Sequence, residues 1–226
     1  METNWIIEHL SKMYIVTKTP LFETLYMVFF STLFATLLGF PIGILLVISK
    51  KGNIMEMPII NKILGIIVNI FRSVPFVILM VYLLPFTRKL IGTTIGDKAA
   101  IVPLSISAAP FVARLIEGAL DGVDRGLIEA SQSMGANNWT IISKVMIPEG
   151  MPQIIHSITV TVISLIGFSA IAGVIGAGGL GNLAIRYGYQ RYMADVMMYA
   201  VIVIVLLVQG IQMIGNLLVE ICKKYR

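Results

Sequence analysis

The sequence has few charged residues and a single cysteine, and both shortages narrow the kind of protein that it can encode. Charged residues make up 13% of the 226 positions and hydrophobic residues 57%, whereas an average soluble domain carries roughly 25% charged residues. This composition indicates that lipid is the solvent for much of the chain. The lone Cys222 cannot form an intrachain disulfide, and His9 and His156 lie too far apart to suggest a metal site.

Other absences exclude further classes. No Gly-x4-Gly-Lys-Ser/Thr segment is present, so the chain has no P-loop with which to hold ATP. The net charge of +5 comes from scattered Lys and Arg residues, without the basic face of a nucleic-acid-binding protein. Gly176, Gly178 and Gly181 match a dinucleotide-binding pattern, but an apolar helical segment precedes them where that site needs a strand. We interpret these glycines as shaping an external loop.

Five apolar segments are long enough to cross a bilayer as helices, which need about 20 residues each. Every backbone polar group must be satisfied within lipid, so these spans are helical. Residues 1–20 lack the pattern of a cleaved signal peptide, and we expect them to precede the first span outside the membrane. The sequence thus predicts an all-α integral membrane protein with a membrane domain at 21–219 and a tail at 220–226. The predicted spans are residues 25–48, 71–90, 99–120, 152–175 and 194–219.

Three features bear on how these spans pack. Gly39 and Gly43 form a Gly-xxx-Gly pair that lets two helices approach closely; we expect packing within the chain, with a dimer face as the alternative. Arg72 interrupts a long apolar stretch, so that either the helix tilts or, as we prefer, the span begins near residue 71 and Arg72 snorkels. Arg114 and Glu117 are spaced to pair along one helix.

The connection at residues 121–149 between spans three and four is polar enough to lie outside the membrane. Asp124 is a suitable N-cap for a first short helix, and Gly135 suits the left-handed position that ends a helix. Asn137 can cap a second helix, which we expect Pro148 to end. Such an amphipathic hairpin either binds a partner or rests on the lipid surface.

The hairpin carries a spaced motif: Glu129-Ala130-Ser131, then Gly135, then Val145-Met146-Ile147-Pro148. This motif resembles the coupling loop of ABC-type importers, which carry Glu-Ala-Ala, three residues, Gly, nine residues and Ile-x-Leu-Pro before the penultimate span. The spacings agree, and the three departures, at Ser131, Val145 and Ile147, are small or apolar exchanges.

The resemblance implies that the hairpin is cytoplasmic and docks on a separate ATPase subunit. It implies that Glu129 meets polar or basic groups there, that Ala130 allows close approach and that Gly135 sets the corner. The C-terminus is then cytoplasmic and the N-terminus external to the bacterial cytoplasmic membrane. The residues predicted to form the docking loop are Glu129, Ala130, Ser131, Gly135, Ile147 and Pro148.

Four further segments carry a resemblance that extends over nearly the whole chain. They are Asn69-Ile-Phe-Arg-Ser-Val-Pro-Phe76, Pro85-Phe-Thr-Arg88, Ala108-Ala-Pro-Phe-Val-Ala-Arg114 and Gly176-Ala-Gly-Gly-Leu-Gly181. With them the sequence is similar to permease subunits of methionine-import ABC transporters. That family implies a homodimer with two ATPases, which use ATP and Mg, and a lipid-anchored or periplasmic substrate-binding protein. This chain itself would be no enzyme and would bind no cofactor.

A path for a zwitterionic, apolar amino acid should be only lightly polar, as the middle of span four is. We predict that this stretch lines the path, with ordinary helix packing as the alternative. A permease for another amino acid or small solute, a gradient-driven transporter and a membrane scaffold are rival functions. The scarcity of acids near the membrane midplane argues against proton coupling. The predicted lining residues are Ser164, Gly167, Phe168, Ser169 and Ile171.

Overall fold

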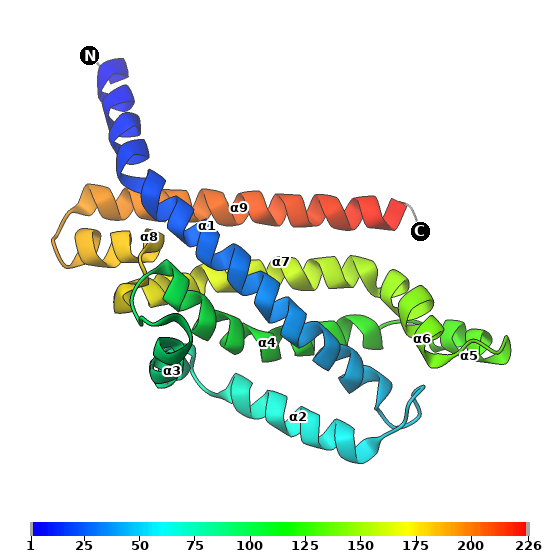
Figure 1. The fold of residues 1–226 in the computed structure, drawn as a ribbon. Helices are drawn as coiled ribbons and strands as arrows, with labels where there is room; N and C mark the ends of the chain where they lie inside the picture. Colours follow the sequence, from blue (N-terminus) through cyan, green and yellow to red (C-terminus); the bar gives the residue numbers. More distant parts are fainter. Residues whose placement is uncertain (1, 225–226) are drawn as a thin grey trace. The chain divides into compact units, whose positions relative to one another are not determined.

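The computed structural model describes residues 2–224, and the side chains of residue 9 and residues 11–224. Every regular element within this range is helical (Figure 1), which confirms the all-α prediction. The longer helices are α1 (Glu2–Ile48), α2 (Pro58–Ser73), α3 (Phe76–Ile91), α4 (Asp97–Asp121), α7 (Ile147–Ala172) and α9 (Ala194–Lys224). The shorter elements are α5 (Arg125–Ser133), α6 (Asn138–Ile141), α8 (Gly179–Asn182) and the π-helical turns η1 (Ile142–Met146), η2 (Gly173–Ala177) and η3 (Leu183–Tyr189).

Four continuous helical stretches are long and apolar enough to cross a membrane, and α2 with α3 forms a broken fifth. The four are residues 11–48, 97–121, 138–177 and 194–224. This agrees with the expected five spans, although the bounds differ. Residues 2–20 belong to the same helix as the first span, while residues 1, 225 and 226 of the two predicted terminal segments lie outside the described residues.

The stretch predicted as the second span, 71–90, is divided between two helices. Helix α2 starts with Pro58 at its first helical position, where a missing N–H costs nothing. It ends at Ser73 because Val74 takes an extended backbone, with ψ of 124°. Proline disfavours the helical conformation in the residue before it, so Pro75 accounts for the break.

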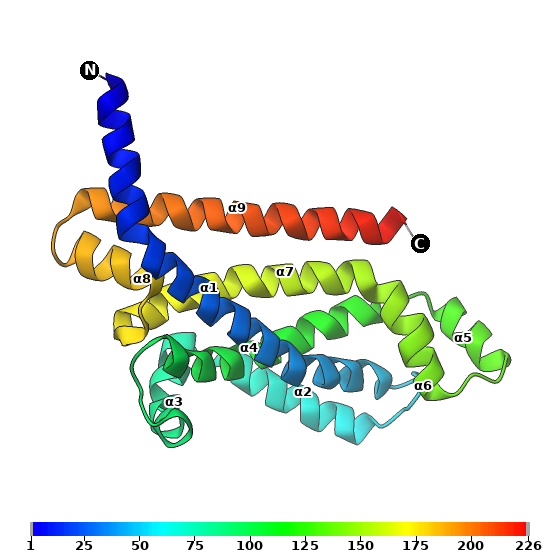
Figure 2. The ribbon, with the colours of Figure 1, turned by 45° about the horizontal axis from the view of Figure 1, so that its top comes forward.

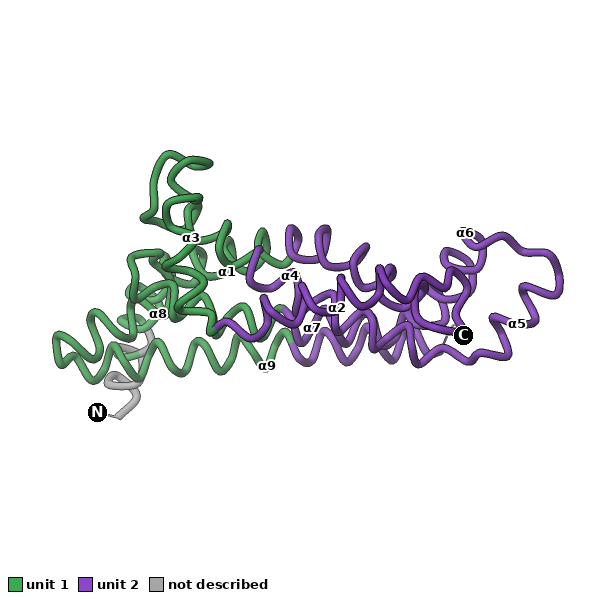
Figure 3. Tube along the Cα trace, turned by 90° about the horizontal axis from the view of Figure 1, so that it is seen from below, with its two compact units in different colours: residues 1–32, 75–105, 162–211 green, residues 33–74, 106–161, 212–226 purple. Residues whose placement is uncertain are grey.

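The chain forms two compact units (Figure 3), and helices α1, α4, α7 and α9 contribute residues to both. Unit 1 holds residues 1–32, 75–105 and 162–211. One of its apolar clusters joins the start of α1, the η3 turn and the start of α9 around the fully buried Ala200. The other members of that cluster are Leu183, Ala184 and Val196, with Val16, Tyr187 and Met197 packed against them.

Unit 2 holds residues 33–74, 106–161 and 212–226, and within it α1 packs directly on α4. A Cβ added at Gly39 would lie 2.4 Å from the carbonyl oxygen of Ala109, and one at Gly43 would lie 2.7 Å from that of Ala113. The Gly-xxx-Gly pair therefore serves a contact within the chain, as predicted, because only glycine lets the backbones approach so closely.

This contact predicts that Gly39→Ala lowers the stability of the protein. The added methyl would force α1 and α4 apart, and such overpacking typically costs about 1–3 kcal/mol. Thermal unfolding in detergent measures the loss. Gly210→Ala is the matched control, since a Cβ at Gly210 would meet no atom within 4 Å. Equal melting temperatures for the two variants would contradict the close contact.

Candidate functional site

The hairpin between α4 and α7 is shaped by local caps. The side chain of Asp124 accepts a hydrogen bond from the N–H of Gly126 at 2.7 Å, which starts α5. Helix α5 ends where Gly135 takes a φ of 78°. There the N–H groups of Gly135 and Ala136 donate to the carbonyls of Gln132 and Ser131, at 2.9 and 3.1 Å. This is the Schellman arrangement, which needs a residue that tolerates positive φ, so the predicted corner at Gly135 is confirmed.

The second arm of the hairpin runs on into the membrane helix instead of ending at Pro148. Asn137 caps α6 as predicted, accepting from the N–H of Thr140 at 2.8 Å. The chain then passes through η1 into α7, and the N–H of Ile147 donates to the carbonyl of Ile142, five residues earlier. This π turn shifts the hydrogen-bond register just before Pro148, which has no N–H to donate. Figures 1 and 2 both show α5 and α6 together beyond the C-terminal end of α4.

The predicted docking residues face in different directions. Glu129 and Ala130 are exposed on α5, while Ser131 is buried and donates its hydroxyl to the carbonyl of Leu127 at 2.7 Å. Ile147 is half-buried and Pro148 exposed at the start of α7. The hairpin therefore presents Glu129 and Ala130 outward, and Ser131 holds α5 against its own chain.

Three large apolar side chains on the hairpin are exposed to solvent in the part of the chain that the structure describes. Leu127 is 40%, Trp139 75% and Met134 81% exposed, whereas Ile128 is buried. Exposed apolar groups of this size, beside a polar rim, are typical of a surface that binds another protein. The sequence pattern suggested this amphipathicity without showing that Trp139 lies outside the chain's own core.

A cavity of about 300 Å³ lies beside α5 in unit 2. Its polar lining includes Asp121, Arg125, Glu129 and Gln132, and the loop between α1 and α2 closes one side with residues 52–54. The exposed carboxylate of Glu129 thus borders a hollow that a partner's side chain can enter.

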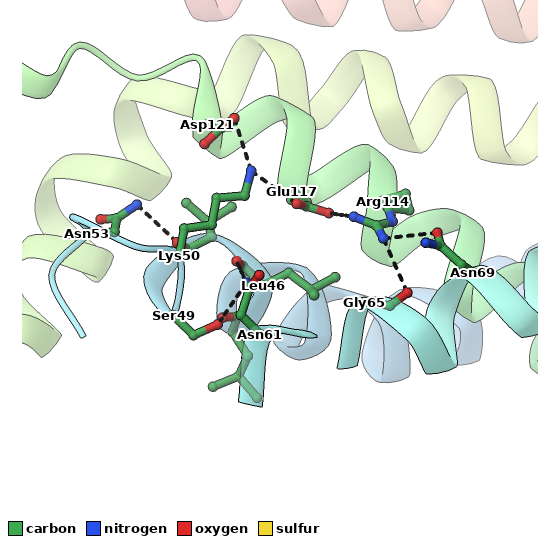
Figure 4. Close-up of polar contacts among 12 residues, drawn as sticks. Leu46, Ser49, Lys50, Asn53, Asn61, Gly65, Asn69, Arg114, Glu117 and Asp121 are labelled. Carbon is green, nitrogen blue, oxygen red and sulfur yellow. Dashed lines mark hydrogen bonds and ion pairs between the residues drawn. The ribbon is translucent and has the colours of Figure 1, made fainter. Parts of the chain in front are cut away.

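A network of polar side chains ties the end of α4 to the end of α1 and to α2 (Figure 4). We call Lys50, Asn69, Arg114, Glu117 and Asp121 the Glu117 network. The ammonium of Lys50 lies 3.1 Å from a carboxylate oxygen of Glu117 and 3.1 Å from one of Asp121. The guanidinium of Arg114 donates to Glu117 at 2.5 Å and to the side-chain oxygen of Asn69 at 2.9 Å. The predicted Arg114–Glu117 pair is confirmed.

The partners of that pair are the part that the sequence did not reveal. In the sequence, Lys50 marked only the end of an apolar run, and Asn69 was only part of a motif.

The ion pairs of Lys50 raise its pKa. Burial lowers the pKa of Lys50, but its hydrogen bonds to Glu117 and Asp121 and their negative charges raise it more, so the pKa lies above its ordinary value of 10.5. The ammonium of Lys50 is therefore charged at neutral pH.

The predicted lining residues of α7 fall on two sides of the helix in unit 1. Ser164, Gly167, Phe168 and Ile171 are at least partly exposed and follow helical spacing along one stripe. Ser169 is 2% exposed, and its hydroxyl donates to the carbonyl of Ile166 at 2.8 Å. A turn of about 100° per residue carries Ser169 away from the stripe, so the structure does not support Ser169 as a lining residue.

Phe168 has a partner that sequence reasoning missed. Its ring stacks on that of Phe76, at the start of α3, with centroids 4.6 Å apart and planes 13° from parallel. Both rings remain partly exposed. A stacked aromatic pair gains about 0.5–1.5 kcal/mol beyond its burial, so the pair fixes the orientation of Phe168.

The glycine-rich segment after α7 is a turn held by α1. Gly176, Gly178 and Gly179 all have positive φ, which glycine adopts without strain. The carboxylate of Glu23 accepts from the N–H of Gly179 at 2.6 Å, and the hydroxyl of Thr24 accepts from that of Leu180 at 2.9 Å. Gly176 and Gly178 therefore serve a backbone turn, as the sequence analysis expected for a loop. Gly181 does not belong to a loop: it is buried in α8, where an added Cβ would lie 2.2 Å from the Cα of Ala170.

The structure joins apolar spans to an exposed helical hairpin, and comparison with known proteins finds a family of membrane transport components. The family described as "Binding-protein-dependent transport system inner membrane component" matches residues 35–224. The chain belongs to this family. Its members are inner-membrane components of transport systems, which agrees with the multi-pass helical fold.

Relatives within the family are strongly similar in sequence. A probable D-methionine transport system permease protein MetI of Pasteurella multocida is 54% identical over 198 residues, which cover 88% of this chain and 91% of the relative. The methionine import system permease protein MetP of Bacillus subtilis is 52% identical over 203 residues, covering 90% and 91%.

Solved structures agree with the sequence relatives. A chain of the inward-facing MetNI methionine ABC transporter, in its native crystal form, has a TM-score of 0.91 and 44% identity, covering 93% of this chain and 98% of its own length. An amino acid ABC transporter solved with histidines has a TM-score of 0.76 at 20% identity, a likeness of fold alone.

Proposed function

We propose that this chain is the membrane-spanning permease subunit of a bacterial ATP-binding-cassette importer, and that its substrate is methionine, in the L form and also the D form. ATP-driven alternating access would move the amino acid across the cytoplasmic membrane. The chain is not itself an ATPase: ATP and Mg are bound and used by a separate subunit. The relatives named for methionine transport support the substrate.

The observation that carries this proposal is the hairpin. It places an exposed Glu129 and three exposed apolar side chains, Leu127, Met134 and Trp139, on a well-capped helical corner. A gradient-driven transporter has no need of such a surface, whereas an importer powered by a separate ATPase must dock it. Apolar anchors beside a charged residue are the usual composition of a protein interface core and rim.

If the hairpin docks on a cytoplasmic ATPase, the orientation of the chain in the membrane and its partners follow. The hairpin at 121–149 lies in the cytoplasm, as does the tail at 220–226, and the segment at 1–20 lies outside. The assembly contains a second copy of this chain, two ATPase subunits and a lipid-anchored or periplasmic substrate-binding protein. The docking residues are Glu129, Ala130, Gly135, Ile147 and Pro148, with Ser131 holding α5 in place.

We place the substrate path along the exposed stripe of α7. Ser164 and Gly167 leave the substrate path open and weakly polar, while Phe168 and Ile171 supply apolar surface to it. The Phe76–Phe168 stack keeps a ring in a set orientation, and thioether sulfurs make favourable contacts with aromatic rings. The stripe therefore suits a small amino acid with an apolar, sulfur-containing side chain.

Uptake into liposomes tests the function. The chain is reconstituted with its candidate ATPase, the binding protein loaded with labelled methionine is added, and uptake is measured with and without ATP on the ATPase side. Ionophores are present throughout to remove ion gradients. We expect uptake that requires ATP and survives the ionophores.

Two other results have distinct meanings. Uptake that ignores ATP and stops with the ionophores would show a gradient-driven transporter and overturn the proposal. ATP-dependent uptake of a different solute, with labelled methionine left outside, would keep the importer and overturn the substrate. Liposomes with the ATPase alone are the control for leakage.

A further inference from the structure

The Glu117 network lies at the point where the hairpin joins the membrane domain. Asp121 is the last residue of α4, and only residues 122–124 separate it from α5. Buried Ile128 and Ser131 hold α5 against the chain. A displacement of the hairpin would therefore act first on Asp121 and the last turn of α4.

Lys50 connects this turn to α1. Its ammonium bridges Glu117 and Asp121, which are one helical turn apart on α4. The loop that carries Lys50 is held in place: the side-chain N–H groups of Asn61 donate to the carbonyl of Leu46 at 2.6 Å and to the hydroxyl of Ser49 at 3.1 Å. The bridge thus joins two backbones that are each fixed locally.

Arg114 connects the same turn to α2. Besides Glu117 and Asn69, its guanidinium donates to the backbone carbonyl of Gly65 at 3.3 Å. The planar guanidinium directs its donors in fixed directions, so these bonds set the rotation of α2 about α4. Figure 4 shows the five side chains as one continuous series from the α1 end to α2.

The buried carboxylate of Glu117 restricts the Glu117 network to one arrangement of its partners. The Glu117 side chain is only 10% exposed and each of its oxygens has its own cationic partner. Removing a partner from the buried Glu117 carboxylate is costly, whereas the side chains of Lys50, Arg114 and Asp121 remain 32%, 25% and 48% exposed. The ion pairs of Glu117 are therefore better explained by the single arrangement of the joined helices that they define than by the stability that they add.

We propose that the Glu117 network is the relay that passes movement of the docking hairpin to α1 and α2, with Lys50 and Arg114 as positioning residues. The inference rests on the proposed importer function. When the hairpin is displaced, Asp121 and Glu117 move with α4, and the two cations carry α1 and α2 along. Without the cations, α4 moves alone and ATP hydrolysis is no longer converted into transport.

Neutralising Lys50 tests the relay against a matched neighbour. Lys50→Met removes the bridge, and Lys51→Met makes the same change at an adjacent exposed lysine for which the described residues show no ion pair. Reconstituted complexes are measured for ATPase co-purification, ATP hydrolysis and methionine uptake. We expect Lys50→Met to keep assembly and hydrolysis and to lose at least about fivefold in uptake per ATP, the lower end of typical coupling factors. Lys51→Met should match the wild type.

Two further variants separate a relay from a structural role. Lys50→Arg keeps the charge and should restore most of the uptake per ATP. Asn69→Ala removes one exposed partner of Arg114, leaves the buried ion pair intact, and should lower uptake per ATP with normal assembly.

Two kinds of result would contradict the relay or the importer function on which it rests. If Lys50→Met and Asn69→Ala keep the wild-type uptake per ATP, or lose uptake only in proportion to lost complex, the network is no relay. If the wild-type complex itself shows no ATP-dependent uptake, the importer function fails first. The two failures therefore cannot be confused.

Discussion

Replacing Glu129 with arginine is expected to end ATP-driven uptake, because it reverses the charge at the centre of the proposed docking surface. Glu129 is exposed on α5 and borders the cavity that Asp121 and Gln132 also line. Placing like charges together at an interface costs several kcal/mol. A loss of about 2–5 kcal/mol weakens association by roughly 30- to 4000-fold, so the ATPase should no longer co-purify with the chain.

The control for this variant makes the same charge reversal elsewhere. Glu220 is an exposed acid in the last turn of α9, outside the hairpin, and Glu220→Arg should leave association intact. Association is measured by co-purification and by titration of the ATPase onto the reconstituted permease. A Glu129→Arg complex as tight as the Glu220→Arg complex would remove Glu129 from the interface. Retained association with lost uptake would instead place its effect in coupling.

Replacing Gly167 with leucine is expected to stop uptake while leaving the fold intact. An added Cβ at Gly167 would meet no atom of the chain within 4 Å, and leucine is a better helix former than glycine by up to about 1 kcal/mol. The side chain would project from the stripe that Ser164, Phe168 and Ile171 share. Each 1.4 kcal/mol added to the barrier slows crossing about tenfold, so we expect uptake to fall at least about tenfold.

Gly210→Leu provides the comparison for this variant. Gly210 lies within α9, and a Cβ there would also meet nothing within 4 Å, so both variants add the same apolar bulk to an apolar helix. Uptake, complex size and melting temperature are measured for each. Normal uptake by Gly167→Leu would exclude the stripe from the path. A Gly167→Leu complex that falls apart while the Gly210→Leu complex survives would assign the stripe to packing between subunits.

Local features of the hairpin were predictable because neighbouring residues decide them. Asp124 and Asn137 cap helices that begin beside them, and Gly135 ends α5 through bonds to residues three to five positions away. The predicted helix end at Pro148 was the exception, because proline usually ends a helix. The π turn at Ile142–Met146 accommodates it inside a continuous helix.

The faces of the helices were harder to predict. The sequence groups Glu129, Ala130 and Ser131 together, but the structure exposes the first two and buries the third. Likewise Ser169 was grouped with Phe168 and lies on another side of α7. In α7, near-uniform apolarity removes the contrast by which a soluble helix shows its inner face, so position along that span says little about direction.

By itself the sequence determined that this protein lies in a membrane, where four of its spans run, and where its hairpin turns, whereas the break that divides the predicted second span came from the structure. These follow from hydrophobic length and from backbone hydrogen bonds that are satisfied between near neighbours. Only the tertiary structure decided that Lys50 meets Glu117, that Phe76 stacks on Phe168, and that Glu23 caps the turn at Gly179. Each of these contacts joins residues far apart in the chain, and their meeting depends on how closely whole helices approach one another, as the glycines at 39 and 43 illustrate.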